Sequence, residues 1–181
     1  MARWAGLFWL LLLLAERGPE ASVSNLQVAP DGNRVLASLV LRNGFGGDLV
    51  ERLESGLPTP ILYRFELARD RKHWYDRGLR ESTLEVAAVY DAVTQEYTVN
   101  YRLDDKLVDS KTVRDRQALE RAMTRLQQMP VFTLEGAPRG PRLLVRARAE
   151  LGTRMLLWVI PARIATPWAE SNKFRLPREA P

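Results

Sequence analysis

The sequence contains no cysteine, and His73 is its single histidine among 181 residues. The lack of cysteine excludes disulfide bonds, thiolate metal ligands and thiol nucleophiles. One histidine excludes a metal site built from several imidazoles and leaves little basis for a Ser-His-Asp triad. We therefore expect no metal ion, no cofactor and no catalytic residue.

Long apolar stretches are also scarce, and the longest is Trp4–Ala15, which follows the cationic Arg3. A membrane-spanning helix needs about 20 apolar residues, whereas secretory signal segments are shorter and start with a positive charge. Residues 1–21 are therefore predicted to be a secretory signal segment, or an N-terminal membrane anchor if they are not cleaved. The expected location is the periplasm or the periplasmic face of the inner membrane, because an exported bacterial protein without cysteine folds there without disulfides.

The remaining composition is that of a globular domain, with 46% hydrophobic and 27% charged residues. The net charge is +5, and most of the cations are arginines. An exported protein does not normally encounter nucleic acid, so the positive charge is not expected to bind it. We expect one β-rich domain over residues 22–176 and a short tail over residues 177–181.

Alternation of apolar and polar residues predicts that most of this domain is β-strand, because side chains of a strand point to opposite faces in turn. The segments with this pattern or with a short apolar run are Ser22–Ala29, Arg34–Leu41, Ile61–Arg69, Glu81–Tyr90, Gln95–Leu103, Lys106–Val108, Val131–Leu134, Arg142–Leu151 and Met155–Ile160. The rest, from Pro161 to Pro181, is expected to be irregular, with Trp168 and Phe174 as anchors.

Two segments have the spacing of helices. Leu49–Ser55 is a short one. The main helix is predicted to start at Thr112, with Asp115 completing an approximate capping box, and to end before Pro130. The fold class that follows is mainly β with one main α-helix, arranged as an antiparallel β-sandwich-like domain. An open antiparallel sheet with the helix on one face is the alternative.

Several motifs together resemble a bacterial domain-of-unknown-function family, number 4390. They are Leu53–Pro58, Ile61–Leu67, Arg69–Asp76 and Val89–Tyr97. The resemblance implies an exported or envelope protein without an assigned activity, and it extends roughly from Val23 to Phe174. Genes of this family often lie beside a membrane sensor histidine kinase and its response regulator. The Pro58-Thr59-Pro60 segment departs from the family pattern, in which the chain runs from the glycine directly into the strand.

One candidate site is the charged connection after Ile61–Arg69, where cations surround two aromatic side chains. The residues are Arg69, Arg71, Lys72, Trp74, Tyr75 and Arg77. Tryptophan, tyrosine and arginine are the side chains that most often dominate binding energy at interfaces, so this loop is a hypothesis for partner binding. A general base at His73, oriented by Asp70 or Asp76, and a loop with only a structural role are the other interpretations.

A second candidate is the row Arg142, Arg146 and Arg148, which share one face of a predicted strand. Such a row suits anionic lipid headgroups or an acidic partner, and the alternative is a solvated sheet face that ends at Glu150. Asp104, Asp105 and Asp109 lack the spacing of a calcium loop, and turn formation explains them better.

The function predicted from these observations is a non-enzymatic interaction module that is periplasmic or tethered to the membrane. The family resemblance adds a role as an accessory to an envelope two-component system, with a membrane sensor kinase as the partner. The alternative is a β-sandwich that binds a lipid or another small ligand. A deep apolar pocket between the sheets would favour the ligand, whereas a filled core with an exposed arginine and aromatic patch would favour the partner.

Overall fold

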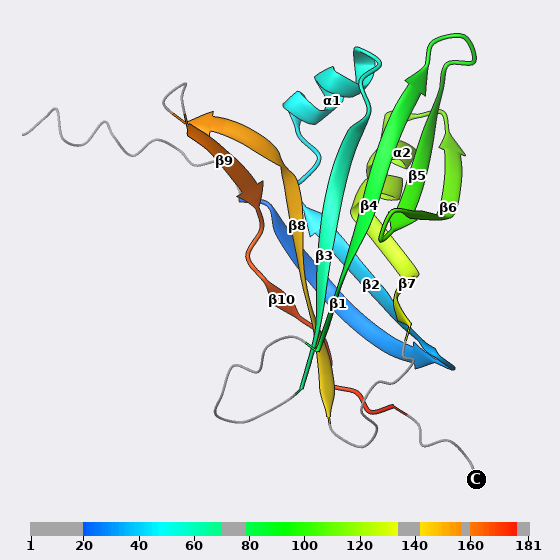
Figure 1. Ribbon diagram of the computed structural model, residues 1–181. Helices are drawn as coiled ribbons and strands as arrows, with labels where there is room; N and C mark the ends of the chain where they lie inside the picture. Colours follow the sequence, from blue (N-terminus) through cyan, green and yellow to red (C-terminus); the bar gives the residue numbers. More distant parts are fainter. Residues whose placement is uncertain (1–19, 70–78, 134–141, 157–159, 177–181) are drawn as a thin grey trace, which may run out of the picture.

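The computed structural model describes residues 20–69, 79–133, 142–156 and 160–176 (Figure 1). The protein is mainly β, with 65% strand in two open antiparallel sheets, which confirms the predicted fold class. The elements in chain order are β1 (Ser22–Asp31), β2 (Arg34–Arg42), α1 (Gly47–Glu54), β3 (Thr59–Arg69), β4 (Arg80–Asp91), β5 (Glu96–Leu103), β6 (Lys106–Val113), α2 (Arg116–Thr124), β7 (Arg125–Thr133), β8 (Leu143–Leu156), β9 (Ile160–Ala165) and β10 (Ala169–Glu170).

The two sheets differ in size. The small sheet has the strand order β1-β2-β7, and the large sheet has the order β10-β8-β3-β4-β5-β6, with β9 paired to β8. Figure 1 shows the small sheet crossing behind the large one, with α2 beside it behind β4 and β5. Neighbouring strands in the chain mostly pair as hairpins, whereas β7 and β8 return to strands much earlier in the sequence.

The core fills the space between the sheets. On β3 the alternate side chains Ile61, Tyr63, Phe65 and Leu67 are fully buried, and they belong to one continuous cluster with residues of β2, β5, β7, β8 and α2. Burial of each such side chain is worth roughly 1.5–3 kcal/mol relative to leaving it exposed. The other face of β3 is only half-buried, so one face of the large sheet lies against the core and the other is presented outwards.

The main helix differs from the prediction. β6 continues to Val113, and α2 begins only after Asp115, whose side chain accepts a hydrogen bond from the backbone N–H of Ala118. The N-cap is therefore Asp115 and not Thr112, where the helix was predicted to start. The helix also ends earlier, at Thr124, because Leu126 and the following residues pair with β2. Pro130 lies within β7, where the register against β2 is irregular and no helix needs to be stopped.

The C-terminal segment is also more regular than predicted. β8 ends at Leu156 and antiparallel β9 starts at Ile160, so that Met155–Ile160 is divided between two strands. Beyond β9 the chain continues along the edge of β8, and Phe174 exchanges both backbone hydrogen bonds with Leu143. The backbone groups at this edge of β8 are thus paired by a segment that shows no strand pattern in the sequence.

Candidate functional site

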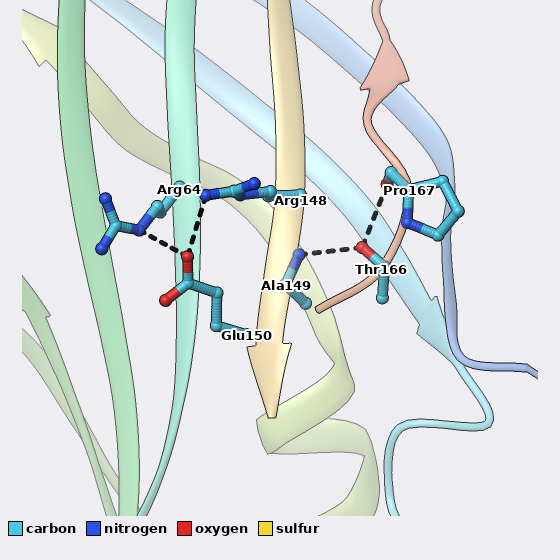
Figure 2. A network of polar contacts seen from close by, with 6 residues as sticks. All are labelled: Arg64, Arg148, Ala149, Glu150, Thr166 and Pro167. Atoms are coloured by element: carbon cyan, nitrogen blue, oxygen red, sulfur yellow. Dashed lines mark hydrogen bonds and ion pairs between the residues drawn. The ribbon is translucent and has the colours of Figure 1, made fainter. Parts of the chain in front are cut away.

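A nearly buried carboxylate holds two arginines together on the outer face of the large sheet (Figure 2). Glu150 of β8 has a side chain only 8% exposed, and its Oε1 lies 2.7 Å from Nε of Arg64 on β3. The same oxygen accepts a hydrogen bond from Arg148, also on β8, at 3.1 Å. A carboxylate that is withdrawn from water needs such compensation, so these three side chains restrain one another.

Trp168 lies against Arg148 and against a third arginine of the same face, Arg146. The Cζ atom of Arg148 is 4.7 Å from the centre of the indole ring, and that of Arg146 is 5.3 Å from it. These distances are typical of cation–π contacts, in which the guanidinium sits over the negative face of the ring. Arg146 also lies 3.8 Å from a carboxylate oxygen of Glu66 and 3.7 Å from one of Glu170.

The segment that carries Trp168 is fixed to β8 by hydrogen bonds on both sides of it. The hydroxyl of Thr166 accepts from the backbone N–H of Ala149 and donates to the carbonyl of Pro167 (Figure 2). Farther along, the hydroxyl of Ser171 accepts from the N–H of Val145. These bonds set the position of the indole ring over the two arginines.

We call this group the arginine–tryptophan surface. It comprises Arg64, Glu66, Arg146, Arg148, Glu150, Trp168 and Glu170. Its three arginines are matched by three glutamates, so it is a mixed network of charges around a partly exposed indole. A pocket of about 40 Å³ opens on it, lined in part by Arg64, Arg148 and Trp168. The arrangement offers an aromatic contact with guanidinium and carboxylate groups at fixed positions.

The structure joins part of the predicted arginine row to this surface. Arg146 and Arg148 belong to it, whereas Arg142 is exposed and precedes β8. The carboxylates beside the first two were not foreseen as their partners, except that Glu150 was placed at the end of the row. Contact of the row with an anionic surface stays a prediction, and the matching carboxylates weaken its electrostatic basis.

Most of the predicted partner-binding loop lies outside the residues that the structure describes. Arg69 is the last residue of β3, while Arg71, Lys72, Trp74, Tyr75 and Arg77 lie outside the described residues, as does His73. The docking hypothesis for this loop therefore stays a prediction. The loop connects β3 to β4.

Sequence reasoning missed the meeting of Trp168 with the arginines. Trp168 was expected only to anchor an irregular tail, because nothing in its local sequence indicates a strand neighbour. Alternation in Ile61–Arg69 places Arg64 on the face opposite the apolar side chains, as observed, but its partner Glu150 on β8 is 86 positions away, and only the pairing of β3 with β8 reveals it.

Two larger cavities open on the outer face of the small sheet. One measures about 430 Å³ and the other about 470 Å³, and both are lined by Gln27 and Ser38. Their remaining lining mixes apolar residues with polar ones such as Asn25, Gln128 and Asn172. Both are open grooves over a sheet face, whereas the layer between the sheets is occupied by core side chains.

Asp104 and Asp105, in the β5–β6 connection, form a turn as predicted, whereas Asp109, which was also attributed to turn formation, lies within β6 and pairs with Tyr101 of β5. Asp104 and Asp105 both have left-handed backbone angles, with φ values of 46° and 67°. The N–H of Asp104 donates to the carbonyl of Thr83, and its carboxylate accepts from the N–H of the same threonine. Among the residues that the structure describes, no group of three or more histidine, cysteine or acidic side chains is placed to hold a metal ion.

Comparison with known proteins gives one match. A family model described as a domain of unknown function, DUF4390, matches residues 18–156. This span includes the strands up to β8, while β9, β10 and Trp168 lie beyond it. No curated protein and no solved structure shows significant similarity to the chain. Within the described part of the chain, no helix has the length and apolar character that crossing a membrane requires.

Proposed function

Because the chain belongs to the DUF4390 family, whose function is unknown, we propose from its own surface that it is a non-catalytic interaction module of the cell envelope. In this proposal the arginine–tryptophan surface binds a protein partner. The observation that carries it is Trp168, a partly exposed indole that lies over two arginines.

The composition of this surface supports protein binding. Residues whose replacement by alanine costs about 2 kcal/mol or more of binding free energy are enriched in tryptophan and arginine. The surface is also ordered before any partner arrives, because Glu150, Glu66 and Glu170 hold the arginines. Side chains that are already restrained lose less entropy on binding than free ones.

The balance of charge favours a protein over a membrane surface. A protein partner can place carboxylates beside the three arginines and cations beside the three glutamates. Anionic lipid headgroups, in contrast, would be repelled by the glutamates. The grooves on the small sheet are open and carry amide side chains, so they suit an acyl chain poorly. A lipid- or ligand-binding role is therefore the weaker candidate.

The proposed location and partner class rest on the N-terminal segment and the family resemblance. A signal segment or anchor over residues 1–21 would bring the domain to the periplasmic face of the inner membrane. The genes that commonly neighbour this family make a membrane sensor kinase the first partner to test. Docking through the loop with Arg71 and Trp74 is a separate hypothesis from the sequence, because these residues lie outside the part of the chain that the structure describes.

The test uses the full-length chain in its own host, with a photo-reactive analogue of tryptophan, which keeps the indole ring, at position 168. Position 93 is the matched control, because Val93 is 93% exposed in the β4–β5 connection. We expect light to produce an adduct with the sensor kinase at position 168 and none at position 93. A Trp168→Ala variant should recover at least tenfold less kinase by chemical cross-linking, while its melting temperature stays unchanged. A tenfold loss of affinity corresponds to roughly 1.4 kcal/mol of binding free energy, which a hot-spot residue readily supplies.

Two results would contradict the proposal. Equal kinase adducts at positions 168 and 93 would mean that the surface has no part in recognition. A phospholipid adduct at position 168, without any protein adduct, would favour the lipid alternative.

A further inference from the structure

Strand β6 forms an open edge of the large sheet. It pairs with β5 on one side, and no strand of the described residues pairs with its other side (Figure 1). Seven of its eight residues are exposed, among them the apolar Leu107, at 61%, and Val108. An exposed edge with apolar side chains is a template for another strand unless the protein blocks it.

The backbone of Ser110 faces this open edge. Its N–H donates to the carboxylate of Asp109 at 2.8 Å, a side chain of its own strand, instead of pairing with β5. Its side-chain hydroxyl donates across the sheet to Asn100 of β5 at 2.9 Å. Backbone groups of alternate residues in a regular strand point to the same side, so Ser110 and Thr112 together present their N–H and C=O groups to the edge, whereas Val108 lies at the register shift between β5 and β6 and has no partner in β5.

We propose that a second copy of this chain pairs with this edge, β6 against β6 in antiparallel orientation, about a two-fold axis at Ser110. The two Ser110 residues would exchange backbone hydrogen bonds, N–H of each to C=O of the other. Asp109 would then lie directly opposite Lys111 of the second copy. This ion pair would occur twice, once on each side of the axis.

The charges of the strand select the second copy and this register. Opposite charges that face each other across two strands are stabilising, while like charges in the same place are destabilising. A shift of the axis to Asp109 would place that carboxylate against itself, and a shift to Lys111 would place two ammonium groups together. The axis at Ser110 avoids both and pairs each Asp109 with Lys111 of the other copy, while Lys106, the third charged residue of the strand, has no residue of β6 opposite it.

Dimer formation would break only weak interactions of the single chain. Asp109 now makes an ion pair of 3.6 Å with Lys111 of its own strand, and the two side chains are 43% and 54% exposed. Exposed ion pairs of this kind contribute little to stability, so their exchange for pairs between chains is nearly free. The N–H of Ser110, now satisfied by Asp109, would take a backbone carbonyl as its acceptor.

A dimer of this form would also affect the proposed function. A two-fold axis at a strand pair lies perpendicular to the sheet, so the outer faces of both large sheets would point the same way. Two arginine–tryptophan surfaces would then face one partner, which raises avidity without new contacts. This consequence rests on the proposed function, whereas the dimer itself does not.

Because the chain contains no cysteine, a disulfide between two copies can form only through an introduced cysteine. A hydrogen-bonded antiparallel pair has Cα atoms about 5.5 Å apart, within the range that a disulfide bridges. The full-length Ser110→Cys variant, expressed in its host and analysed without reductant, is expected to form a covalent dimer of twice the chain mass. Val93→Cys, equally free of other thiols and more exposed, controls for random collision.

Charge exchange then tests the register. Asp109→Lys added to Ser110→Cys should reduce the disulfide-linked dimer at least tenfold, because lysines would face each other. Further addition of Lys111→Asp should restore it, since the two charges have only changed places. Unchanged melting temperatures of the variants would show that the fold tolerates these exposed positions.

The proposal is wrong if Ser110→Cys yields no more dimer than Val93→Cys, or if the charge exchange fails to restore a dimer that Asp109→Lys has removed. A disulfide adduct of another mass at position 110 would also overturn it, because another protein would then occupy the edge. Trp168→Ala should leave the dimer yield unchanged, which separates this test from that of the proposed function.

Discussion

The C-terminal end of α2 depends on two tyrosine hydroxyls from the large sheet. The last carbonyls of a helix have no partner within it. In this protein the hydroxyl of Tyr63 donates to the carbonyl of Met123, and that of Tyr101 donates to the carbonyl of Ala122, both at 2.8 Å. We predict that removal of either hydroxyl destabilises the protein, and that Tyr63 matters more.

The difference follows from burial. Tyr63 is fully buried, so Tyr63→Phe leaves the Met123 carbonyl without a partner in a place that water does not reach. Such a loss costs about 1–3 kcal/mol, and we expect about 2 kcal/mol of unfolding free energy here. The Tyr101 bond is only partly buried, so Tyr101→Phe should cost about 1 kcal/mol, near the ordinary net value of one hydrogen bond.

Urea unfolding of both variants and of the double variant measures these losses. For a domain of this size each kcal/mol corresponds to roughly 2–4 °C in melting temperature, so Tyr63→Phe should melt about 4–8 °C lower. The double variant should lose less than the sum, because both bonds hold the same helix end. A loss below about 0.5 kcal/mol for Tyr63→Phe would refute the reasoning, since surface substitutions have effects of that size.

Alkaline pH tests the same two groups independently. Burial raises the pKa of Tyr63 far above its ordinary value, and burial together with the charge of Asp109 raises the pKa of Tyr101 to about 12. Both stay protonated in the folded protein, whereas in the unfolded chain they ionise near pH 10. Their contribution is therefore complete below pH 10 and is lost as the pH rises from 10 towards the folded pKa. Replacement by phenylalanine should flatten this decline; parallel curves for wild type and the double variant would contradict it.

Three further predictions address the core face, the buried carboxylate and export. Val99→Asp should unfold or strongly destabilise the domain because Val99 is fully buried, whereas Thr98→Asp on the opposite face should be mild; equal melting losses would show that the faces are wrongly assigned. Glu150→Gln should cost about 1–3 kcal/mol in urea unfolding by removing the charge between two arginines, and no loss would mean that the network is dispensable. Leu12→Arg inserts a charge worth about 2.5–3.5 kcal/mol on insertion scales, so periplasmic yield should fall sharply, and wild-type yield would exclude targeting by this segment.

Alternation was enough to predict most strands. Ile61–Arg69 and Gln95–Leu103 were expected from period 2 and are observed as Thr59–Arg69 and Glu96–Leu103. The same alternation puts Tyr63 and Tyr101 on the apolar faces of these strands, and both are buried in the structure. This pattern is local, because the pleat of a strand sends successive side chains to opposite faces whatever its neighbours are.

Where the local pattern was weak, tertiary pairing determined the structure. Nearly every residue of β6 is exposed, so no apolar alternation marks the strand, and its length follows from pairing with β5. At the start of α2 both Thr112 and Asp115 are good N-caps by residue type. Thr112 is paired with Thr98 of β5, and the helix therefore starts after Asp115.

The candidate site shows the same division most clearly. The sequence by itself determined that Arg64, Arg146 and Arg148 point outwards, because each alternates with apolar residues in its own strand. Only the tertiary structure placed Arg64 opposite Arg148, set Glu150 between them and laid Trp168 over the face. The orientation of a side chain follows from covalent geometry within a few residues, whereas strand register follows from the burial of whole faces by segments far apart in the chain.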